Sequence, residues 1–396
     1  MRVRWDRRHF LKQAAVAAGA WGAAPLFFSR KVQAADAAPA LNTWASFRNG
    51  PQNWGIAAGT LPEKLELKWE VTTPDGTAST AVIADGRVYM GTLSGDLLCL
   101  QLSDGKEVWR YKSVEKVEEN SFAPGFNAAA ALDEQHIYIG DDQGTFHAVD
   151  RMTGKKAWLA ATDGEIVGGA QVIGGKVIFG SHDGHLYCHQ AASGERVWAV
   201  ETHGPVNATP CLAGKYTFTT GCDQPVLRVI DIEKGEQSSE VSLKSLLIAA
   251  ATVRDDILYF GTDNGSVSAL DWQKKQFVWE FSVPNRDQQI QSSPAVTEEF
   301  VIIGSRDKQL YCLDRNTGVL RWSFQCRAKI DSSPVVVGDR VYFGASDRNL
   351  YGVTLADGKE AFKQNVKQSV TGSPAVAEGR LVIGTDSTNG QILCFG

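Results

Sequence analysis

The sequence lacks several features that would assign it to a functional class directly. None of its seven cysteines belongs to a Cys-x-x-Cys-His motif, which excludes a covalently attached c-type haem. The uncharged apolar run at residues 14–28 has fifteen residues and is interrupted by glycine and proline, so it is too short for a stable membrane span. No later segment has a convincing helical pattern. The 40 lysines and arginines are outnumbered by 45 acidic residues, which argues against nucleic-acid binding.

An apolar run that ends in glycine is present eight times, at intervals of 40 to 49 residues. The eight glycines are Gly91, Gly140, Gly180, Gly221, Gly261, Gly304, Gly344 and Gly384. Around each of them, apolar and polar residues alternate between tight turns rich in glycine and aspartate, which indicates short strands and hairpins. A period near 40 made of several short strands is typical of a β-propeller. The sequence therefore predicts an all-β, eight-bladed propeller of four-stranded antiparallel blades.

A second phrase, complete in AVDRMTGKKAW at residues 148–158, accompanies each repeat and usually ends in tryptophan. We predict that these tryptophans fill the gaps between neighbouring blades, where each buried side chain is worth roughly 2–3 kcal/mol. They are Trp69, Trp109, Trp158, Trp198, Trp279 and Trp322. Ser239 and Phe362 take the tryptophan position in two repeats, and we expect the Ser239 junction to be the loosest. The phrase is interpreted as structural rather than as a ligand site.

The two ends of the repeat region complement each other. The last repeat ends at Gly396 after its third strand, whereas LELKWEV, Leu65 to Val71, resembles an isolated fourth strand. We predict that the strand containing Trp69 completes the eighth blade and so removes exposed sheet edges. Residues 61–396 would form the propeller, and residues 35–60 a linker followed by a packing segment. Trp44, Phe47 and Trp54 are expected to pack against the side of the propeller.

Residues 1–34 are interpreted as a signal peptide. Arg7 and Arg8 precede the apolar run, and Val32-Gln33-Ala34 is an acceptable cleavage site, so the segment resembles a twin-arginine export signal. Asp6 stands where that pattern usually has serine or threonine. Removal of residues 1–34 would leave 33 basic and 44 acidic residues, a net charge of about −11. The expected mature protein is periplasmic or secreted, without a lipid anchor or transmembrane helix.

The cysteines are predicted to be core residues rather than a disulfide framework. Cys99, Cys188, Cys312 and Cys394 occupy the same small-residue position in different repeats, too far apart to pair. Cys211 and Cys222 share a repeat and could form a disulfide. The predicted hairpin register instead places Cys211 near Phe218.

The phrase A-x-D-x-x-T-G-x-x-x-W resembles the repeat of the pyrroloquinoline quinone (PQQ) family of eight-bladed propellers, over roughly residues 44–396. Two branches of that family are relevant. The quinoprotein alcohol dehydrogenases are enzymes, and the resemblance implies a vicinal Cys-Cys disulfide, calcium held by Glu, Asn and Asp, and a catalytic Asp. This chain has no Cys-Cys dipeptide, and no catalytic residue can be carried over. The second branch is the non-enzymatic scaffold BamB of the outer-membrane β-barrel assembly machinery.

The resemblance favours an exported BamB-like scaffold that binds protein partners, with envelope assembly proteins as candidates and no cofactor expected. The familiar members of that branch are lipid-anchored through an N-terminal cysteine, whereas the first cysteine here is Cys99. A PQQ-dependent oxidoreductase with calcium is the alternative, and a small-ligand or glycan-binding propeller is the third interpretation.

Two regions are candidate binding sites. The strand order predicts that the insertions near residues 113–126 and 284–290 rise from one face, and Phe122, Phe126 and Arg286 are the candidate partner contacts. The second region is the central channel. Its predicted lining lies three residues before each Pro of the S-P or T-P pairs, or at the matching position: Ala78, Asn127, Val167, Asn207, Ile248, Gln291, Asp331 and Thr371. Of these, Asn127, Asn207, Gln291 and Asp331 are the candidate ligand contacts.

That ring is half polar with a single acid, which favours a water-filled channel over a quinone pocket, since a quinone carboxylate needs cations. His182 and His185 flank a turn at a spacing that could hold a metal. Without a carboxylate or thiol aimed at them, they are interpreted as surface histidines and no metal site is predicted.

Overall fold

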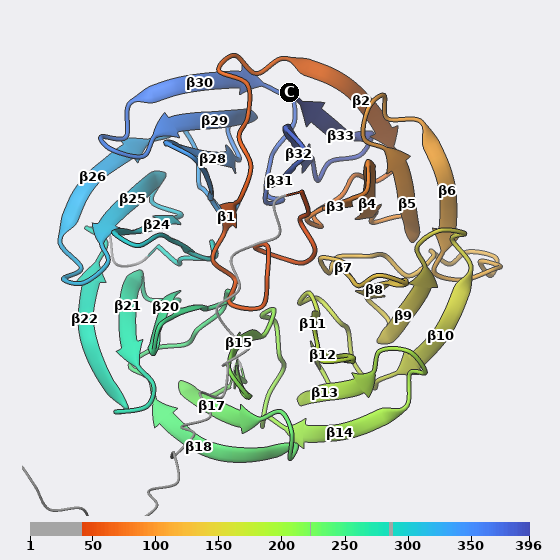
Figure 1. Cartoon of the computed structure of the whole chain (residues 1–396), viewed down its shortest axis with the longest axis horizontal. Coiled ribbons are helices and arrows are strands. Elements are labelled where there is room, and N and C mark those ends of the chain that lie inside the picture. The colour runs from red at the N-terminus through yellow and green to blue at the C-terminus, as the bar shows by residue number, and fades with distance from the viewer. Residues whose placement is uncertain (1–41, 222, 285–287) are drawn as a thin grey trace, which may run out of the picture. The chain divides into compact units, whose positions relative to one another are not determined.

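Eight sheets of four antiparallel strands form a ring in the computed structural model (Figure 1). The structure describes residues 42–396, apart from Cys222 and residues 285–287. The described residues contain no helix. The eight-bladed, all-β propeller predicted from the repeats is therefore confirmed. The signal peptide expected at residues 1–34 lies outside the described residues.

Each blade contributes one strand to each of four concentric layers. The innermost strands are β3 (Val82–Ala84), β7 (Ala131–Leu132), β11 (Gln171–Ile173), β15 (Cys211–Ala213), β19 (Thr252–Arg254), β23 (Ala295–Val296), β27 (Val335–Val337) and β31 (Ala375–Ala377). The second strands are β4 (Arg87–Gly91), β8 (His136–Gly140), β12 (Lys176–Ser181), β16 (Tyr216–Thr220), β20 (Ile257–Gly261), β24 (Phe300–Gly304), β28 (Arg340–Ala345) and β32 (Arg380–Gly384).

The third strands are β5 (Asp96–Gln101), β9 (Thr145–Asp150), β13 (His185–Gln190), β17 (Val226–Asp231), β21 (Ser266–Asp271), β25 (Gln309–Asp314), β29 (Asn349–Thr354) and β33 (Gly390–Phe395). The outer strands are β6 (Glu107–Lys112), β10 (Lys156–Ala161), β14 (Arg196–Glu201), β18 (Glu236–Ser242), β22 (Gln276–Ser282), β26 (Leu320–Gln325), β30 (Glu360–Asn365) and β2 (Leu67–Thr73). Blades are numbered one to eight from β3 to β31, and β1 (Ile56–Ala57) is a fifth, parallel strand of blade seven.

Strand β2 closes the ring by pairing with β33, and Trp69 lies opposite Cys394. The outer strand of blade eight thus comes from the N-terminal side of the propeller, and its other three strands come from the C-terminal end (Figure 1). The predicted closure is confirmed.

A β-bulge precedes the tryptophan position in every blade. In blade two it leaves Ala157 unpaired and sets Trp158 opposite Ala148. A small residue faces the tryptophan in all six tryptophan blades, as Ala148, Ala269, Cys99, Cys188, Cys312 or Cys394. Because the indole fills the space beside this position, alanine or cysteine fits there. All six cysteines that the structure describes are free and buried.

The tryptophans join neighbouring blades, as predicted. Each indole N–H donates to a backbone carbonyl of the next blade at 2.8–3.1 Å. The ring also covers a turn glycine of that blade. A Cβ built on Gly154 would lie 2.7 Å from Trp109, and one on Gly194 would lie 2.5 Å from Trp158. The glycine of the T-G turn thus has a positive φ and also makes room for the indole.

Blade four departs from this arrangement. Ser239 lies opposite Val229, so the large and small positions are exchanged. The space between blades four and five is filled instead by Trp272 of blade five, whose ring centre lies 5.3 Å from that of Tyr216 and 5.1 Å from that of Phe218. We expected the loosest junction here. In the structure, the aromatic side chain that fills this junction comes from blade five instead of blade four.

Cys211 of blade four lies opposite Phe218, as the predicted register required. Its hypothetical partner Cys222 lies outside the described residues. A disulfide between these two residues is therefore not assigned.

Candidate functional site

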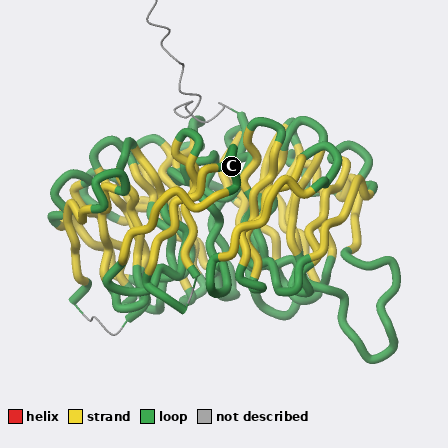
Figure 2. The backbone as a smooth tube through the Cα atoms, turned by 90° about the horizontal axis from the view of Figure 1, so that it is seen from below, coloured by secondary structure: helices red, strands yellow, loops and turns green. Residues whose placement is uncertain are grey.

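The connections between blades lie on the same face as the turns between second and third strands. Ser113 N–H donates to the Gly95 carbonyl at 2.9 Å, and Phe126 N–H donates to the Thr92 carbonyl at 2.9 Å. Both ends of the 113–126 connection, hereafter the 113–126 loop, are therefore bound to a turn of blade one. The segment extends beyond the outer strands between β6 and β7, and Figure 2 shows a long loop standing away from the ring on that side.

The 113–126 loop carries the most exposed large apolar side chain among those described. The Phe122 side chain is 91% exposed, and Val117 on the same loop is 43% exposed. Glu115, Glu118 and Glu119 are also exposed. The loop therefore presents an aromatic group in an acidic setting.

Phe126 is wrongly predicted as a partner contact, because it is fully buried. A Cβ on Gly91 would lie 2.5 Å from the Phe126 side chain, so Phe126 packs where the glycine leaves room. The same relationship joins Gly140 to Ile166 and Gly304 to Ile330. Phe126 thus occupies a core position of the repeat, immediately before the channel residue. The sequence could have revealed this core position. The residue before each channel residue is buried, and in most repeats it is apolar. Arg286 lies outside the described residues.

A buried polar chain supports the base of the loop. The Tyr111 hydroxyl lies 2.9 Å from His147 Nδ1, and His147 Nε2 lies 3.0 Å from a carboxylate oxygen of Asp141. The ring of Phe126 meets that of His147 edge to face, with centroids 5.3 Å apart. Burial, assisted by the Asp141 carboxylate, raises the pKa of Tyr111 to about 12. These hydrogen-bonded side chains join blades one and two, and they were not predicted from the sequence.

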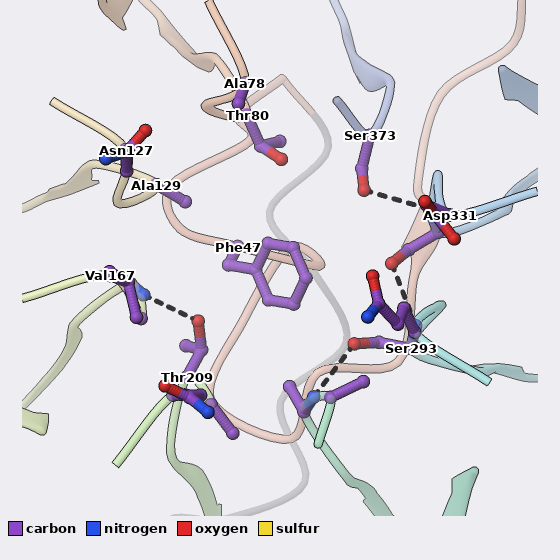
Figure 3. A pocket seen from close by; sticks show the side chains of 18 of the residues that line it. Phe47, Ala78, Thr80, Asn127, Ala129, Val167, Thr209, Ser293, Asp331 and Ser373 are labelled. Atoms are coloured by element: carbon purple, nitrogen blue, oxygen red, sulfur yellow. Dashed lines mark hydrogen bonds between the residues drawn. The ribbon is translucent and has the colours of Figure 1, made fainter. Parts of the chain in front are cut away.

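The eight residues predicted to line the channel all line one central cavity of about 210 Å³ (Figure 3). A second layer follows two residues later in each repeat, as Thr80, Ala129, Gly169, Thr209, Ala250, Ser293, Ser333 and Ser373. Its hydroxyls link the blades, because Ser293 N–H donates to Ser333 Oγ at 2.9 Å and Ser333 N–H donates to Ser373 Oγ at 3.0 Å. This layer could have been recognised in the sequence from the serine or threonine of the S-P and T-P pairs.

Residues 44–57 cross the centre of the ring at one end of this cavity, seen in red to orange in Figure 1. The backbone of this segment bonds to inner strands around the ring through the pairs Trp44–Ile83, Ala45–Leu132, Pro51–Leu212, Gln52–Val253, Trp54–Val296 and Gly55–Val336. In blade three, Gln171 Nε2 donates to Asn53 Oδ1 at 2.8 Å. The segment therefore closes the inner end of the channel, which is the end away from the face that carries the blade connections.

Trp44, Phe47 and Trp54 lie within this central region, not against the side of the propeller as expected. Trp44 is fully buried, and Phe47 lines the cavity. Trp54 Nε1 donates to the Val253 carbonyl at 2.8 Å. Hydrophobic spacing alone could not distinguish the side of the ring from its centre, because an aromatic residue can pack against strands at either place.

Asp331 is part of an ion-pair cluster. Arg306 Nε lies 2.8 Å from Asp331 Oδ1, and Lys329 Nζ lies 2.7 Å from Asp331 Oδ2. The Arg306 guanidinium also donates to Gln291 Oε1. The single acid predicted from the strand starts is therefore accompanied by two cations. Arg306 was missed because it comes from a turn of the preceding blade, and Lys329 was missed because only the position three residues before the proline was considered.

The other predicted polar residues have separate surroundings. The Asn207 amide oxygen contacts His182 Nε2, and the Thr371 hydroxyl donates to Asp386 at 2.8 Å. His182 Nδ1 lies 3.7 Å from Glu165 Oε2, and His185 Nδ1 lies 3.3 Å from Asp183 Oδ1. The expectation that no carboxylate faces these histidines is therefore wrong, although each contacts a different one. Across the residues described, no three His, Cys, Asp or Glu side chains gather in a way that could hold a metal ion.

Comparison with known proteins identifies the relatives of this propeller. The chain is 25% identical over 308 residues to lupanine 17-hydroxylase [cytochrome c] of a Pseudomonas species. The aligned region covers 65% of this chain and 43% of the hydroxylase. It is 24% identical over 281 residues to outer membrane protein assembly factor BamB of Xanthomonas campestris, covering 66% of this chain and 68% of that protein. The chain thus matches less than half of the hydroxylase.

Two solved structures share the fold. BamB of Moraxella catarrhalis superimposes with a TM-score of 0.69 at 18% identity, over 84% of this chain and 97% of that one. Quinohemoprotein alcohol dehydrogenase of Comamonas testosteroni gives a TM-score of 0.75 at 12% identity, over 89% and 80%. At these identities the likeness concerns the fold alone. No helix among the residues described is long and apolar enough to span a bilayer.

The family described as outer membrane protein assembly factor BamB matches this chain at residues 46–158, 115–203, 164–291 and 263–394, which together cover nearly all of the propeller. The same repeats carry the tryptophan phrase, the inter-blade glycines and the closing strand. The chain therefore belongs to the family described as outer membrane protein assembly factor BamB.

Proposed function

We propose that this chain is a non-enzymatic scaffold of the cell envelope that binds a protein partner through the 113–126 loop. The observation that carries the proposal is Phe122, whose side chain is 91% exposed on a loop with an anchored base. Aromatic residues often dominate the binding energy of protein interfaces when they enter a pocket of the partner. The BamB proteins among the relatives are named for outer-membrane protein assembly, which supports an envelope partner.

The charge of the loop indicates the chemistry of that partner. Residues 114–122 contain three glutamates and one lysine, so a basic surface around an apolar pocket would complement them. Such charges mainly raise the association rate and favour the correct orientation. We therefore expect the interaction to weaken as the salt concentration rises.

The experiment is photo-crosslinking in cells with benzoylphenylalanine at position 122. The matched control places the same group at Met152, which is 61% exposed in the turn after β9, on the opposite face. A discrete product with one envelope protein at position 122 and none at 152 supports the proposal. Excess mature protein should abolish that product, whereas excess Phe122→Ala protein should not. Equal products at both positions, or none at position 122, would overturn it.

A quinone-dependent oxidoreductase is the second candidate, favoured by the relatives and by the two cations that contact the channel residue Asp331. Arg306 and Lys329 are both engaged by Asp331, so the three groups carry one net positive charge. A quinone with several carboxylates needs more free cationic groups than this. These contacts therefore do not fit a quinone with several carboxylates.

We also propose that the protein reaches the envelope by the twin-arginine route. The support is the Arg7-Arg8 pair ahead of the apolar run at residues 14–28.

A further inference from the structure

Nine of the twenty residues that line the channel have side chains that both donate and accept hydrogen bonds. Hydroxyls come from Thr80, Thr209, Ser293, Ser333, Thr371 and Ser373, and side-chain amides come from Asn127, Asn207 and Gln291. Hydroxyl and amide groups have both hydrogen-bonding roles, which matches a ligand with several hydroxyls. The backbone N–H groups that donate to Ser293, Ser333 and Ser373 hold these side chains in place before any ligand arrives.

The charges at the channel favour a neutral ligand. Arg306 binds Asp331 with two nitrogens, at 2.8 and 3.1 Å, and also binds Gln291. Lys329 contacts the same carboxylate. An anionic ligand would have to compete with Asp331 for both cations, whereas a neutral ligand leaves these ion pairs intact.

Phe47 adds an apolar surface to this polar cavity. The residue is half-buried, and its ring stands at the centre of the lining residues in Figure 3. The negative face of an aromatic ring attracts the partly positive hydrogens of C–H groups. One face of a pyranose ring carries such hydrogens, while its hydroxyls point outward at the edge. The arrangement of a central aromatic ring and peripheral polar groups matches that geometry.

The size of the cavity sets an upper limit on the ligand. Its volume is about 210 Å³, below the roughly 300–1,000 Å³ of pockets that enclose drug-sized molecules. Because residues 44–57 form the inner end, a ligand would enter from the face that carries the blade connections. A single ring fits such a cavity better than a large fused ring system.

We propose that the central channel binds one neutral polyhydroxylated ring, such as a monosaccharide or the end unit of a glycan. Asn127, Asn207 and Gln291 would hydrogen-bond its hydroxyls, and Phe47 would stack on its C–H face. This site goes beyond the scaffold function and does not depend on it, because the 113–126 loop and the channel are separate parts of the molecule.

The test is ligand-observed NMR titration of the mature protein with glucose, myo-inositol and maltose, beside citrate and PQQ with Ca²⁺ as charged comparators. We expect millimolar binding of glucose or myo-inositol, and no tighter binding of either comparator. Maltose that binds at least as tightly as glucose identifies a glycan end as the ligand, and weaker maltose binding identifies a free sugar. Both of these results support the site.

Variants locate the binding. Ala129→Leu, which fills the second layer, and Asn127→Ala should each weaken glucose binding at least tenfold. Asn316→Ala, at an exposed turn outside the cavity, should leave it unchanged. Thermal unfolding of each variant verifies that it is folded, and Asn127→Ala serves if Ala129→Leu is not. The proposal is overturned if folded wild-type protein binds none of the three neutral probes up to about 100 mM, if citrate or PQQ binds more tightly, or if the folded channel variants bind glucose like wild type.

Discussion

Trp158 covers Gly194 of the next blade, and its indole N–H donates to the carbonyl of Ala191 at 2.9 Å. One aromatic side chain therefore joins two blades by packing and by a hydrogen bond. The glycine serves both its own turn, through a φ of +75°, and the indole, through the absence of a Cβ. This relationship explains why glycine and tryptophan recur together in the repeat phrase.

Gly194→Ala should destabilise the propeller by more than the strain of a positive φ. That strain costs roughly 1–2 kcal/mol for alanine, and the clash of the new Cβ with Trp158 adds roughly 1–3 kcal/mol. The matched control is Gly175→Ala, where φ is also +75° but nothing lies within 4 Å of the new Cβ. Denaturant unfolding measures both. Equal losses in the two variants would show that the packing of Trp158 on Gly194 contributes little.

Trp272→Ala should open a cavity between blades four and five and cost roughly 3–5 kcal/mol, the usual range for removing a buried tryptophan. A quadruple variant, Ser239→Trp, Val229→Ala, Trp272→Leu and Lys275→Gly, rebuilds the regular junction and should recover at least half of that loss. Calorimetric unfolding provides the comparison. If the quadruple variant is no more stable than Trp272→Ala, the exchange of positions between the two blades is not what fills this junction.

The fold could be predicted because its signals are local and repeated. Strand alternation, turn glycines and the tryptophan position each depend on neighbouring residues, and the truncated last repeat indicated the closing strand. The eight channel residues were found in the same way, from their spacing to the S-P and T-P pairs. A repeat thus determines the layers of its own blade and the residues that each blade turns toward the centre.

Features that join different blades were less predictable. Phe122 and Phe126 were both candidate partner contacts, but only Phe122 is exposed, and Phe126 packs on Gly91 of blade one. Arg306 reaches Asp331 only because blades six and seven are neighbours. The position of Phe47 depends on a segment whose sequence does not repeat. Each of these contacts depends on the assembled ring, which spacing within one repeat does not describe.

The buried thiols should be chemically inert in the folded protein. Burial raises the pKa values of Cys99, Cys188, Cys312 and Cys394 to about 12. At pH 8 the reactive thiolate is then about one part in ten thousand of each. In a Cys222→Ser background, iodoacetamide should label none of these residues before unfolding, and all of them in guanidinium chloride. Mass spectrometry reads the sites, and rapid labelling of Cys188 in the native state would contradict this prediction.

The export proposal predicts that Arg7→Lys with Arg8→Lys retains the protein in the cytoplasm, because the twin-arginine pathway reads that pair. We expect at least a tenfold loss of periplasmic protein on fractionation. The control variant, Arg2→Lys with Arg4→Lys, makes the same charge-conserving substitutions outside the pair. It should be exported normally. Export of folded protein would also protect the buried thiols, since the chain would not be unfolded in an oxidising compartment where disulfides form. Normal export of the Arg7 and Arg8 variant would refute this route, and mixed disulfides in the exported wild-type protein would argue that it crosses the membrane unfolded.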